Sequence, residues 1–390
     1  MLDTILSITA FRQLAADPRY FIMIFFALGL MYLAVGKKKE PFLLLPLAFG
    51  ILLANLPGAN LSAYDEGGLL FYLYKGIRPA LNASPIYPPL IFLCIGAMTD
   101  FGPLIASPRT ALIGLGGQLG IFVAFGLALL TKYIPGLDHL GFEGFDTASA
   151  ACIGIIGSSD GPTSIYAAAR LNDTLLPAVA IAAFSYMGLV PFIQPPIMRL
   201  LTNAKERVIV MPEPKHVTRR QKILFPIGLT IIVMVMVPTA GTLIGALMLG
   251  NLIRESGVVN RYVDSLTNTF LNILTLLLAF SIGSSTRADY FLTVETILII
   301  ILGLVAFATG TVGGVLVAKL LCKLTGGKIN PLIGNSGVSA MPMAARISQR
   351  LGQQYNHQNH LLMHAMGPIV SSTIGSAIIA GIFIALYTGK

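Results

Sequence analysis

Apolar residues occur along this chain in long runs that are separated by short polar or basic segments. Ten of these runs approach or exceed the roughly 20 residues that a helix needs to cross the hydrocarbon core of a bilayer. They lie at about 20–36, 41–56, 88–106, 110–131, 174–201, 223–238, 240–254, 268–283, 294–322 and 361–387. The pattern predicts an all-α polytopic membrane protein.

Two further segments, 147–170 and 331–347, are rich in glycine and polar at their centres. Irregular backbone is tolerated at membrane depth only where it is buried in protein or lines a cavity. We therefore expect each segment to form a broken or re-entrant hairpin instead of an ordinary span.

Composition and charge support a membrane protein and a definite orientation. Hydrophobic residues make up 55% of the chain and charged residues only 11%, and the net charge of +9 arises from Lys and Arg in short loops. That distribution is the positive-inside pattern and not a nucleic-acid patch. It places residues 37–39 and the basic loop around 199–222 in the cytoplasm, and the acidic loop with Asp138, Glu143 and Asp146 outside. Both basic loops lie on one side only if 147–170 is re-entrant.

Counting segments then predicts an internal repeat. Residues 20–201 hold five crossings and a hairpin, residues 223–387 hold the same set, and an odd number of crossings inverts the second copy. The expected units are 1–202, a cytoplasmic linker at 203–222, and 223–390. Local similarities have the same order in both halves: residues 95–99 resemble 282–286, 156–159 resemble 333–336, and 186–188 resemble 365–367. Asp100 and Arg287, at corresponding positions, are paired helix breaks or interfacial charges.

The first hairpin contains the one carboxylate of its segment, Asp160, next to Ser159 and among the helix breakers Gly157, Gly161 and Pro162. An acid in the bilayer costs at least about 2.5–3.5 kcal/mol, so it is a functional site by default. Breakers free backbone carbonyls, which then coordinate a cation beside the carboxylate. The alternative is that these small residues only allow close helix packing.

The second hairpin supplies neutral groups for the other half of an ion site. Asn330, Asn335 and Ser339 offer oxygen ligands, and Gly334 and Gly337 open the backbone. One carboxylate with several neutral oxygens suits Na⁺, because a divalent site recruits more carboxylates. The sequence therefore predicts a Na⁺ site at Asp160.

Three long motifs resemble one known family. They are GIIGSSDGPTSIY around Asp160, SYMGLVPFIQPPIM around Tyr186, and INPLIGNSGVSAMPMAARISQ through Ser339 and Arg346. They are similar to the β subunits of the sodium-pumping, biotin-dependent decarboxylases of oxaloacetate, methylmalonyl-CoA and glutaconyl-CoA. The resemblance implies a multi-pass protein of the inner (cytoplasmic) membrane. It also implies a subunit that receives carboxybiotin, releases CO₂ with uptake of a proton, and exports Na⁺.

The resemblance also implies site residues and partners. The catalytic residues would be Asp160, Tyr186, Ser339 and Arg346, with Asn330 and Gly334 as further functional positions. The partners would be a biotin carrier protein, a carboxyltransferase subunit and a small membrane subunit, in a complex with a homotrimer of this chain. Biotin would be attached to the carrier and not to this chain. Recognition of the acyl substrate would belong to the carboxyltransferase, so this sequence does not name it.

Several roles stay open at this point. Tyr186 ligates Na⁺, relays a proton or is a packed aromatic, and Arg346 clamps carboxybiotin or is a positive-inside anchor. We expect His357, His360 and His364 to be solvated and not to form a metal site. A secondary Na⁺-coupled carrier of a small organic anion is the alternative function. A purely structural anchor would leave Asp160 unexplained.

Overall fold

The computed structural model describes residues 14, 16–38, 40–57, 61–77, 84–137, 139, 142–213 and 216–388. Over these residues helices are the only regular structure and no strand is present, which confirms the all-α prediction. Lys39, Asp138 and Lys215, which also entered the orientation argument, lie outside the described residues.

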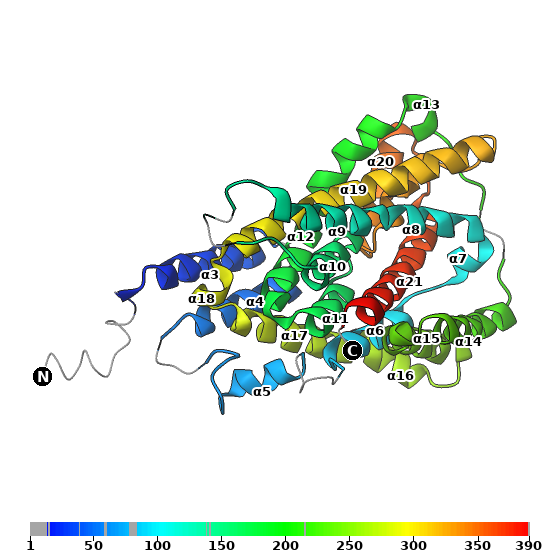
Figure 1. Ribbon diagram of the computed structural model, residues 1–390. Helices are drawn as coiled ribbons and strands as arrows, with labels where there is room; N and C mark the ends of the chain where they lie inside the picture. Colours follow the sequence, from blue (N-terminus) through cyan, green and yellow to red (C-terminus); the bar gives the residue numbers. More distant parts are fainter. Residues whose placement is uncertain are drawn as a thin grey trace, which may run out of the picture.

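The first half of the chain forms a series of helices interrupted by short breaks (Figure 1). They are α3 (Arg19–Val35), α4 (Pro41–Ala54), α5 (Leu69–Lys75), α6 (Tyr87–Met98), α7 (Gly102–Ala106), α8 (Ala111–Gly117), α9 (Leu119–Leu130), α10 (Thr147–Ile155), α11 (Gly161–Leu171) and α12 (Leu176–Leu201). Short 3₁₀ turns join several of them, at Pro108–Thr110, Thr131–Tyr133, Ile156–Ser158 and Asp173–Leu175.

The second half follows a similar order of long and broken helices. They are α13 (Ala204–Arg207), α14 (Arg219–Met236), α15 (Gly241–Ser256), α16 (Asn260–Asp264), α17 (Leu271–Ser285), α18 (Ala288–Phe291), α19 (Val294–Leu324), α20 (Met343–Tyr355) and α21 (Leu362–Tyr387). A π-helical turn at Ser265–Phe270 joins α16 to α17, and 3₁₀ turns lie at Pro238–Ala240 (η6) and Pro331–Gly337 (η8).

Helices occupy all ten of the predicted apolar runs, but within the described residues four are long and apolar enough to span a membrane unbroken. These are Pro108–Tyr133, Asn260–Ser285, Val294–Leu324 and Leu362–Tyr387. A fifth, Asp173–Leu201, is bent by 59° next to Gly188, where Pro191 removes a helical hydrogen bond. The shorter helices are bounded by prolines and polar capping residues. The helix α4, with 14 residues, is about 21 Å long, whereas the hydrocarbon core of a bilayer is about 30 Å thick.

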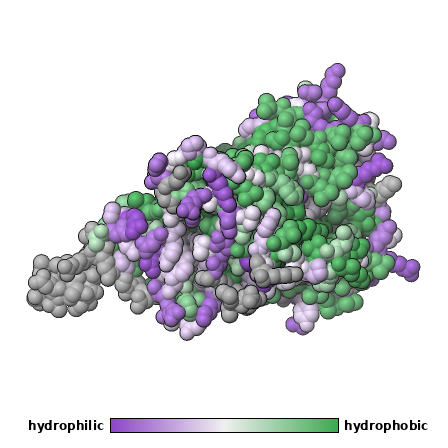
Figure 2. Space-filling view, viewed as in Figure 1, coloured by the Kyte–Doolittle hydropathy of each residue, from purple (hydrophilic) through white to green (hydrophobic). Residues whose placement is uncertain are grey.

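The outer surface of this helical assembly is strongly apolar. Figure 2 shows a broad hydrophobic area bounded by polar atoms on two sides. On α14 several apolar side chains face outward, and Val235 and Met236 are 78% and 76% exposed. An exposed apolar surface of this extent is typical of contact with lipid or another membrane subunit. The fold is that of a multi-pass membrane protein.

Glycines allow the backbones of several helices and of both hairpins to lie in direct contact inside the molecule. A Cβ on Gly117 would lie 1.7 Å from the carbonyl oxygen of Gly337, and one on Gly120 would lie 2.3 Å from that of Ala306 in α19. Gly157 in turn packs on the backbone of Gly120. Because only glycine permits such approach, α8, α9, α19 and both hairpins meet here.

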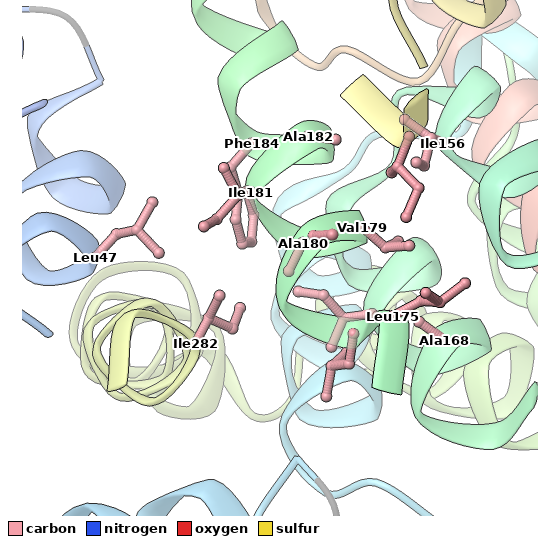
Figure 3. Close-up of a cluster of buried hydrophobic side chains, with 14 of the residues drawn as sticks. Leu47, Ile156, Ala168, Leu175, Val179, Ala180, Ile181, Ala182, Phe184 and Ile282 are labelled. Atoms are coloured by element: carbon pink, nitrogen blue, oxygen red, sulfur yellow. The ribbon is translucent and has the colours of Figure 1, made fainter. Parts of the chain in front are cut away.

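Apolar side chains of α12 pack against the first hairpin and hold it against the rest of the molecule. Figure 3 shows Val179, Ile181 and Phe184 of α12 between Ile156 of the hairpin break and the pair Leu47 and Ile282, which come from α4 and α17. These side chains are part of one buried apolar cluster. The break is thus fixed between the glycine contacts and this cluster.

Two helix pairs make corresponding contacts. The helix α4 packs on α17, and α6 packs on α15. The Nδ2 of Asn55, after α4, donates to the carbonyl oxygen of Thr286 at 2.8 Å, and the Nδ2 of Asn251 in α15 donates to that of Thr99 at 3.0 Å. Thr99 and Thr286 follow the ends of α6 and α17, so each pair uses an asparagine to bind the end of its partner helix.

The charged residues that follow these two helix ends are both paired. Asp100 accepts a hydrogen bond from Lys222 at 2.9 Å, and Arg287 donates to Asp289 at 2.9 Å. Both residues therefore stand at a helix break and also form an ion pair. The structure thus places Asp100 and Arg287 at helix breaks, as one of the two interpretations has it, and pairs each with an opposite charge.

We expect Gly117→Ala to destabilise the protein markedly. The new methyl group would meet the carbonyl of Gly337, and overpacking against backbone that cannot yield costs about 1–3 kcal/mol or more. Gly126→Ala is the matched control. Gly126 lies in α9, the next helix, and a Cβ at this position would have nothing within 4 Å. Thermal unfolding in detergent measures the difference. Equal melting temperatures for the two variants would contradict the close contact.

Candidate ion site at the helix breaks

The first hairpin breaks at Ser159 and Asp160, between Gly157 and Gly161. The helix α10 continues into a 3₁₀ turn that ends at Ser158, and Ser159 has φ 57° in the left-handed region. A non-glycine residue rarely takes that conformation, which reverses the chain here. Asp160 then caps α11, with Pro162 in the first turn, where a missing N–H costs nothing.

Asp160 is buried, with 5% of its surface exposed, and is surrounded by hydroxyl groups. Its Oδ2 accepts hydrogen bonds from Thr163 Oγ1 at 2.8 Å and from Ser376 Oγ of α21 at 2.9 Å. Its Oδ1 accepts from the N–H of Thr163 at 3.4 Å. The positive end of the α11 dipole also favours an anion at this position.

No basic residue of the described chain forms an ion pair with Asp160. Among the same residues, no three His, Cys, Asp or Glu side chains lie close enough together to hold a metal ion, and His357, His360 and His364 form no such group. A buried carboxylate with neutral donors alone calls for a proton or one monovalent cation to balance its charge.

The second hairpin meets the first at this position. The N–H of Ser339 donates to the carbonyl oxygen of Ser158 at 2.8 Å, and its hydroxyl donates to Ser372 of α21 at 3.0 Å. Gly334 and Gly337 hold the second hairpin close to α19, since a Cβ on Gly334 would lie 2.4 Å from Val315 and one on Gly337 would lie 3.0 Å from Gly314. Asp160, Ser159 and Ser339 therefore share one buried polar region.

Asn330 and Asn335 are not brought to that region. Asn335 exchanges two hydrogen bonds with Gln194 of α12, at 2.8 and 3.0 Å, and accepts a third from Ser348. Asn330 donates to the carbonyl oxygens of Arg207 and Ile209 in the linker, at 3.1 and 2.8 Å. The amide groups of both residues are thus engaged in holding the second hairpin.

The first part of the predicted linker, 203–222, is bound to the helical assembly. Three asparagine amides donate to three consecutive linker carbonyls: Asn330 to Arg207 and Ile209, Asn356 to Val208, and Asn359 to Arg207. Arg207 also donates to the hydroxyl of Tyr355 at 2.8 Å. The first part of the linker is therefore docked on the second hairpin and α20.

Tyr186 and Arg346 lie apart from the carboxylate. The Tyr186 hydroxyl donates to the carbonyl of Ile300 in α19, and the ring packs at Gly303 beside Ile156. Arg346 is exposed on α20 and lines an open depression with Arg350, Gln353 and His357. The structure thus gives Tyr186 a packed position and Arg346 an accessible one.

Three hydroxyls at the site were not predicted from the sequence. Thr163 and Ser376 bind Asp160 directly, and Ser372 binds Ser339. Thr163 stands three residues after Asp160, the spacing of a capping interaction, so the motif carried that signal. Ser372 and Ser376 are 33 and 37 residues after Ser339 in an apolar helix, where spacing along the chain gives no indication of contact.

A multi-pass helical membrane protein with one carboxylate in a buried polar centre is the class that this fold and site define. The chain belongs to the family described as Na⁺-transporting oxaloacetate decarboxylase beta subunit, whose sequence model matches residues 19–387. This agrees with the resemblance of the three motifs, and the chain is accordingly a subunit of a decarboxylase complex.

Individual relatives are similar over nearly the whole chain. Methylmalonyl-CoA decarboxylase subunit beta of Veillonella parvula is 51% identical over 365 residues, covering 94% of this chain and 92% of the relative. Glutaconyl-CoA decarboxylase subunit beta of Acidaminococcus fermentans is 50% identical over 361 residues, covering 93% and 91%. Oxaloacetate decarboxylase beta chain 2 of Salmonella typhi is 45% identical over 412 residues, covering 93% and 94%. Relatives with three different substrates leave the substrate of this chain's complex undefined.

Proposed function

We propose that this chain couples the decarboxylation of carboxybiotin to the export of Na⁺. The observation that carries the proposal is the buried carboxylate of Asp160, which has hydroxyl donors but no basic partner. In the reaction the N–CO₂ bond of carboxybiotin breaks, CO₂ leaves, and the biotin nitrogen takes up one proton. If Asp160 holds either Na⁺ or H⁺, the exchange of one for the other at this carboxylate would couple Na⁺ transport to the proton that the biotin nitrogen takes up.

The proposed roles follow from where the residues lie. Asp160 binds the cation together with Ser159 and the Ser339 region of the second hairpin. Arg346, accessible on α20, binds the carboxylate of incoming carboxybiotin through its guanidinium. Asn330 and Asn335 hold the second hairpin in position, and Tyr186 fixes α12 against α19.

The proposal includes the partners that such a reaction needs. Biotin is carried by a separate carrier protein, is carboxylated by a carboxyltransferase subunit, and reaches this chain in the cell's inner membrane. A small membrane subunit and a homotrimer of this chain complete the complex. The accessible position of Arg346 supports delivery by a carrier from the aqueous side.

The proposed architecture is two inverted repeats, 1–202 and 223–390, each with one re-entrant hairpin. The two matching helix contacts support this architecture. In the repeat, α4 corresponds to α15 and α6 corresponds to α17. The two-fold axis that relates them then converts the hydrogen bond from Asn55 to Thr286 into the one from Asn251 to Thr99. The two breaks also meet each other, at Ser158 and Ser339. Inverted repeats place their ion site at such a meeting point.

Purified complex in proteoliposomes tests the function. Supplied with carboxylated biotin carrier, it should release CO₂ and move ²²Na⁺ across the membrane, with both rates depending on Na⁺. Decarboxylation without ²²Na⁺ movement in sealed, ion-tight vesicles would contradict coupling. Movement of Na⁺ with an organic anion and without CO₂ release would instead identify a secondary carrier.

The topology makes a separate prediction. Single cysteines at Lys38, Lys205 and Lys328 should be labelled by a membrane-impermeant thiol reagent from the cytoplasmic side, and one at Glu143 from outside. Cys94, Cys152 and Cys322 are buried and would be replaced by alanine first. Labelling of Lys38 and Lys205 from opposite sides would show that 147–170 crosses the membrane, and the inverted repeat would fail.

A further inference from the structure

Gln118 is a buried glutamine between α8 and α9 whose amide is only half satisfied. Its side chain is 3% exposed, and its Nε2 donates to the carbonyl oxygen of Ser372 at 3.1 Å and to the Ser372 hydroxyl at 3.0 Å. A weaker contact reaches the carbonyl oxygen of Gly114 at 3.3 Å. Its Oε1 is buried and has no hydrogen-bond partner among the residues that the structure describes.

The orientation of this amide is determined by its neighbours. If oxygen and nitrogen were exchanged, the oxygen would face two carbonyl oxygens, which repel it. The unpartnered atom is therefore a carbonyl oxygen. A buried acceptor without a donor costs free energy unless something in the functioning protein occupies it.

Gln118 stands where the two hairpins meet. Gly117, just before it, packs on Gly337 of the second hairpin, and Gly120, two residues after it, packs on Gly157 of the first. Ser372 accepts hydrogen bonds from both Gln118 and Ser339, and one helical turn later Ser376 donates to Asp160. Gln118 is thus linked through α21 to the carboxylate.

A second unpartnered oxygen lies beside the same carboxylate. The Oγ of Ser159, the residue before Asp160, is buried, and no group in the described part of the chain forms a hydrogen bond with it. Oxygen ligands, one of them charged, are what a hard cation requires. We infer that the side-chain oxygen of Gln118, at the junction of α8 and α9, is a ligand of the cation that Asp160 binds. The hydroxyl of Ser159, in the first hairpin, is a second neutral ligand.

This inference rests on the proposed Na⁺ site, which the two hairpins form, and adds two structural units to it. These are α21, through the hydroxyl of Ser376, and the junction of α8 and α9, through Gln118. Asn251 is the matched control for Gln118. Its Oδ1 is also buried and unpartnered among the described residues, but its Nδ2 binds the end of α6 at Thr99, and no hydrogen bond joins it to Asp160.

The test measures Na⁺ binding without turnover, in the purified complex. Thermal unfolding is followed as NaCl replaces choline chloride at constant ionic strength, which gives a half-saturating Na⁺ concentration. We expect Gln118→Met to raise that concentration about tenfold or more, which is about 1.4 kcal/mol of binding. Gln118→Asn, which keeps the amide but withdraws it by one methylene, should give an intermediate value. Asn251→Leu should change the melting temperature but not the half-saturating concentration.

The outcomes separate the inference from the proposed function. A half-saturating Na⁺ concentration within twofold of wild type in both Gln118 variants would overturn the inference and assign the orphan oxygen to a buried water. If Asp160→Asn keeps the full Na⁺ response, the proposed site itself fails. Loss of the response in Asp160→Asn and its weakening in the Gln118 variants would support both. A Gln118→Met variant that does not fold leaves Gln118→Asn as the deciding measurement.

Discussion

Asp160→Asn should abolish coupled decarboxylation and Na⁺ transport, with rates reduced by about 100-fold or more, while the protein still folds. Asparagine has nearly the volume of aspartate and caps helices equally well, so the start of α11 should be preserved. What the substitution removes is the negative charge, on which cation binding depends. The measurement is CO₂ release and ²²Na⁺ movement in proteoliposomes supplied with carboxylated carrier.

Asp146→Asn is the control for this experiment. Asp146 caps α10 as Asp160 caps α11, and its Oδ1 accepts from the N–H of Ser149 at 2.9 Å. It is exposed and at the other end of the same hairpin. We expect this variant to keep nearly full activity. Near-normal coupled activity in Asp160→Asn would refute the ion-site assignment, and equal loss in both variants would point to helix capping as the only role.

The helical elements could be read from the sequence because they depend on local chemistry. Apolar runs bounded by prolines, glycines and charges became helices at every predicted place, and the polar interruption at Ser159 and Asp160 became a break. Full span length was overestimated, since residues of an apolar run such as 88–106 are divided between α6 and α7 by the break at Thr99 to Phe101.

Long-range partners could not be read in this way. Asn335 looked like an ion ligand because an amide offers oxygen, but its Nδ2 donates to Gln194, 141 residues away, and its Oδ1 accepts from Ser348. Asn330 likewise serves the linker at Arg207 and Ile209. Gln118 lies in an apolar run with no motif around it, and only the packing of two hairpins on its flanking glycines draws attention to it.

Lowering the pH should weaken the apparent affinity for Na⁺, because Na⁺ and a proton compete for the carboxylate of Asp160. No basic side chain of the described chain pairs with that carboxylate, so one of the two cations must balance its charge. Below the pKa of the empty site, the half-saturating Na⁺ concentration for decarboxylation should rise by up to about tenfold for each pH unit. By reciprocity, binding of Na⁺ promotes loss of the proton from Asp160, and that proton is then available to the biotin nitrogen.

The measurement is the half-saturating Na⁺ concentration from about pH 5.5 to 8.5 at constant ionic strength, with folding checked at each pH. Asp146→Asn should reproduce the wild-type profile, because its substitution leaves the site unchanged. Persistence of the effect at high ionic strength is decisive: the influence of protons on surface carboxylates would be screened by salt, whereas competition at one buried site would remain. A pH-independent half-saturating concentration in folded protein would mean that Na⁺ and the proton use different sites, and the proton for biotin would then have to arrive by a path that does not include Asp160.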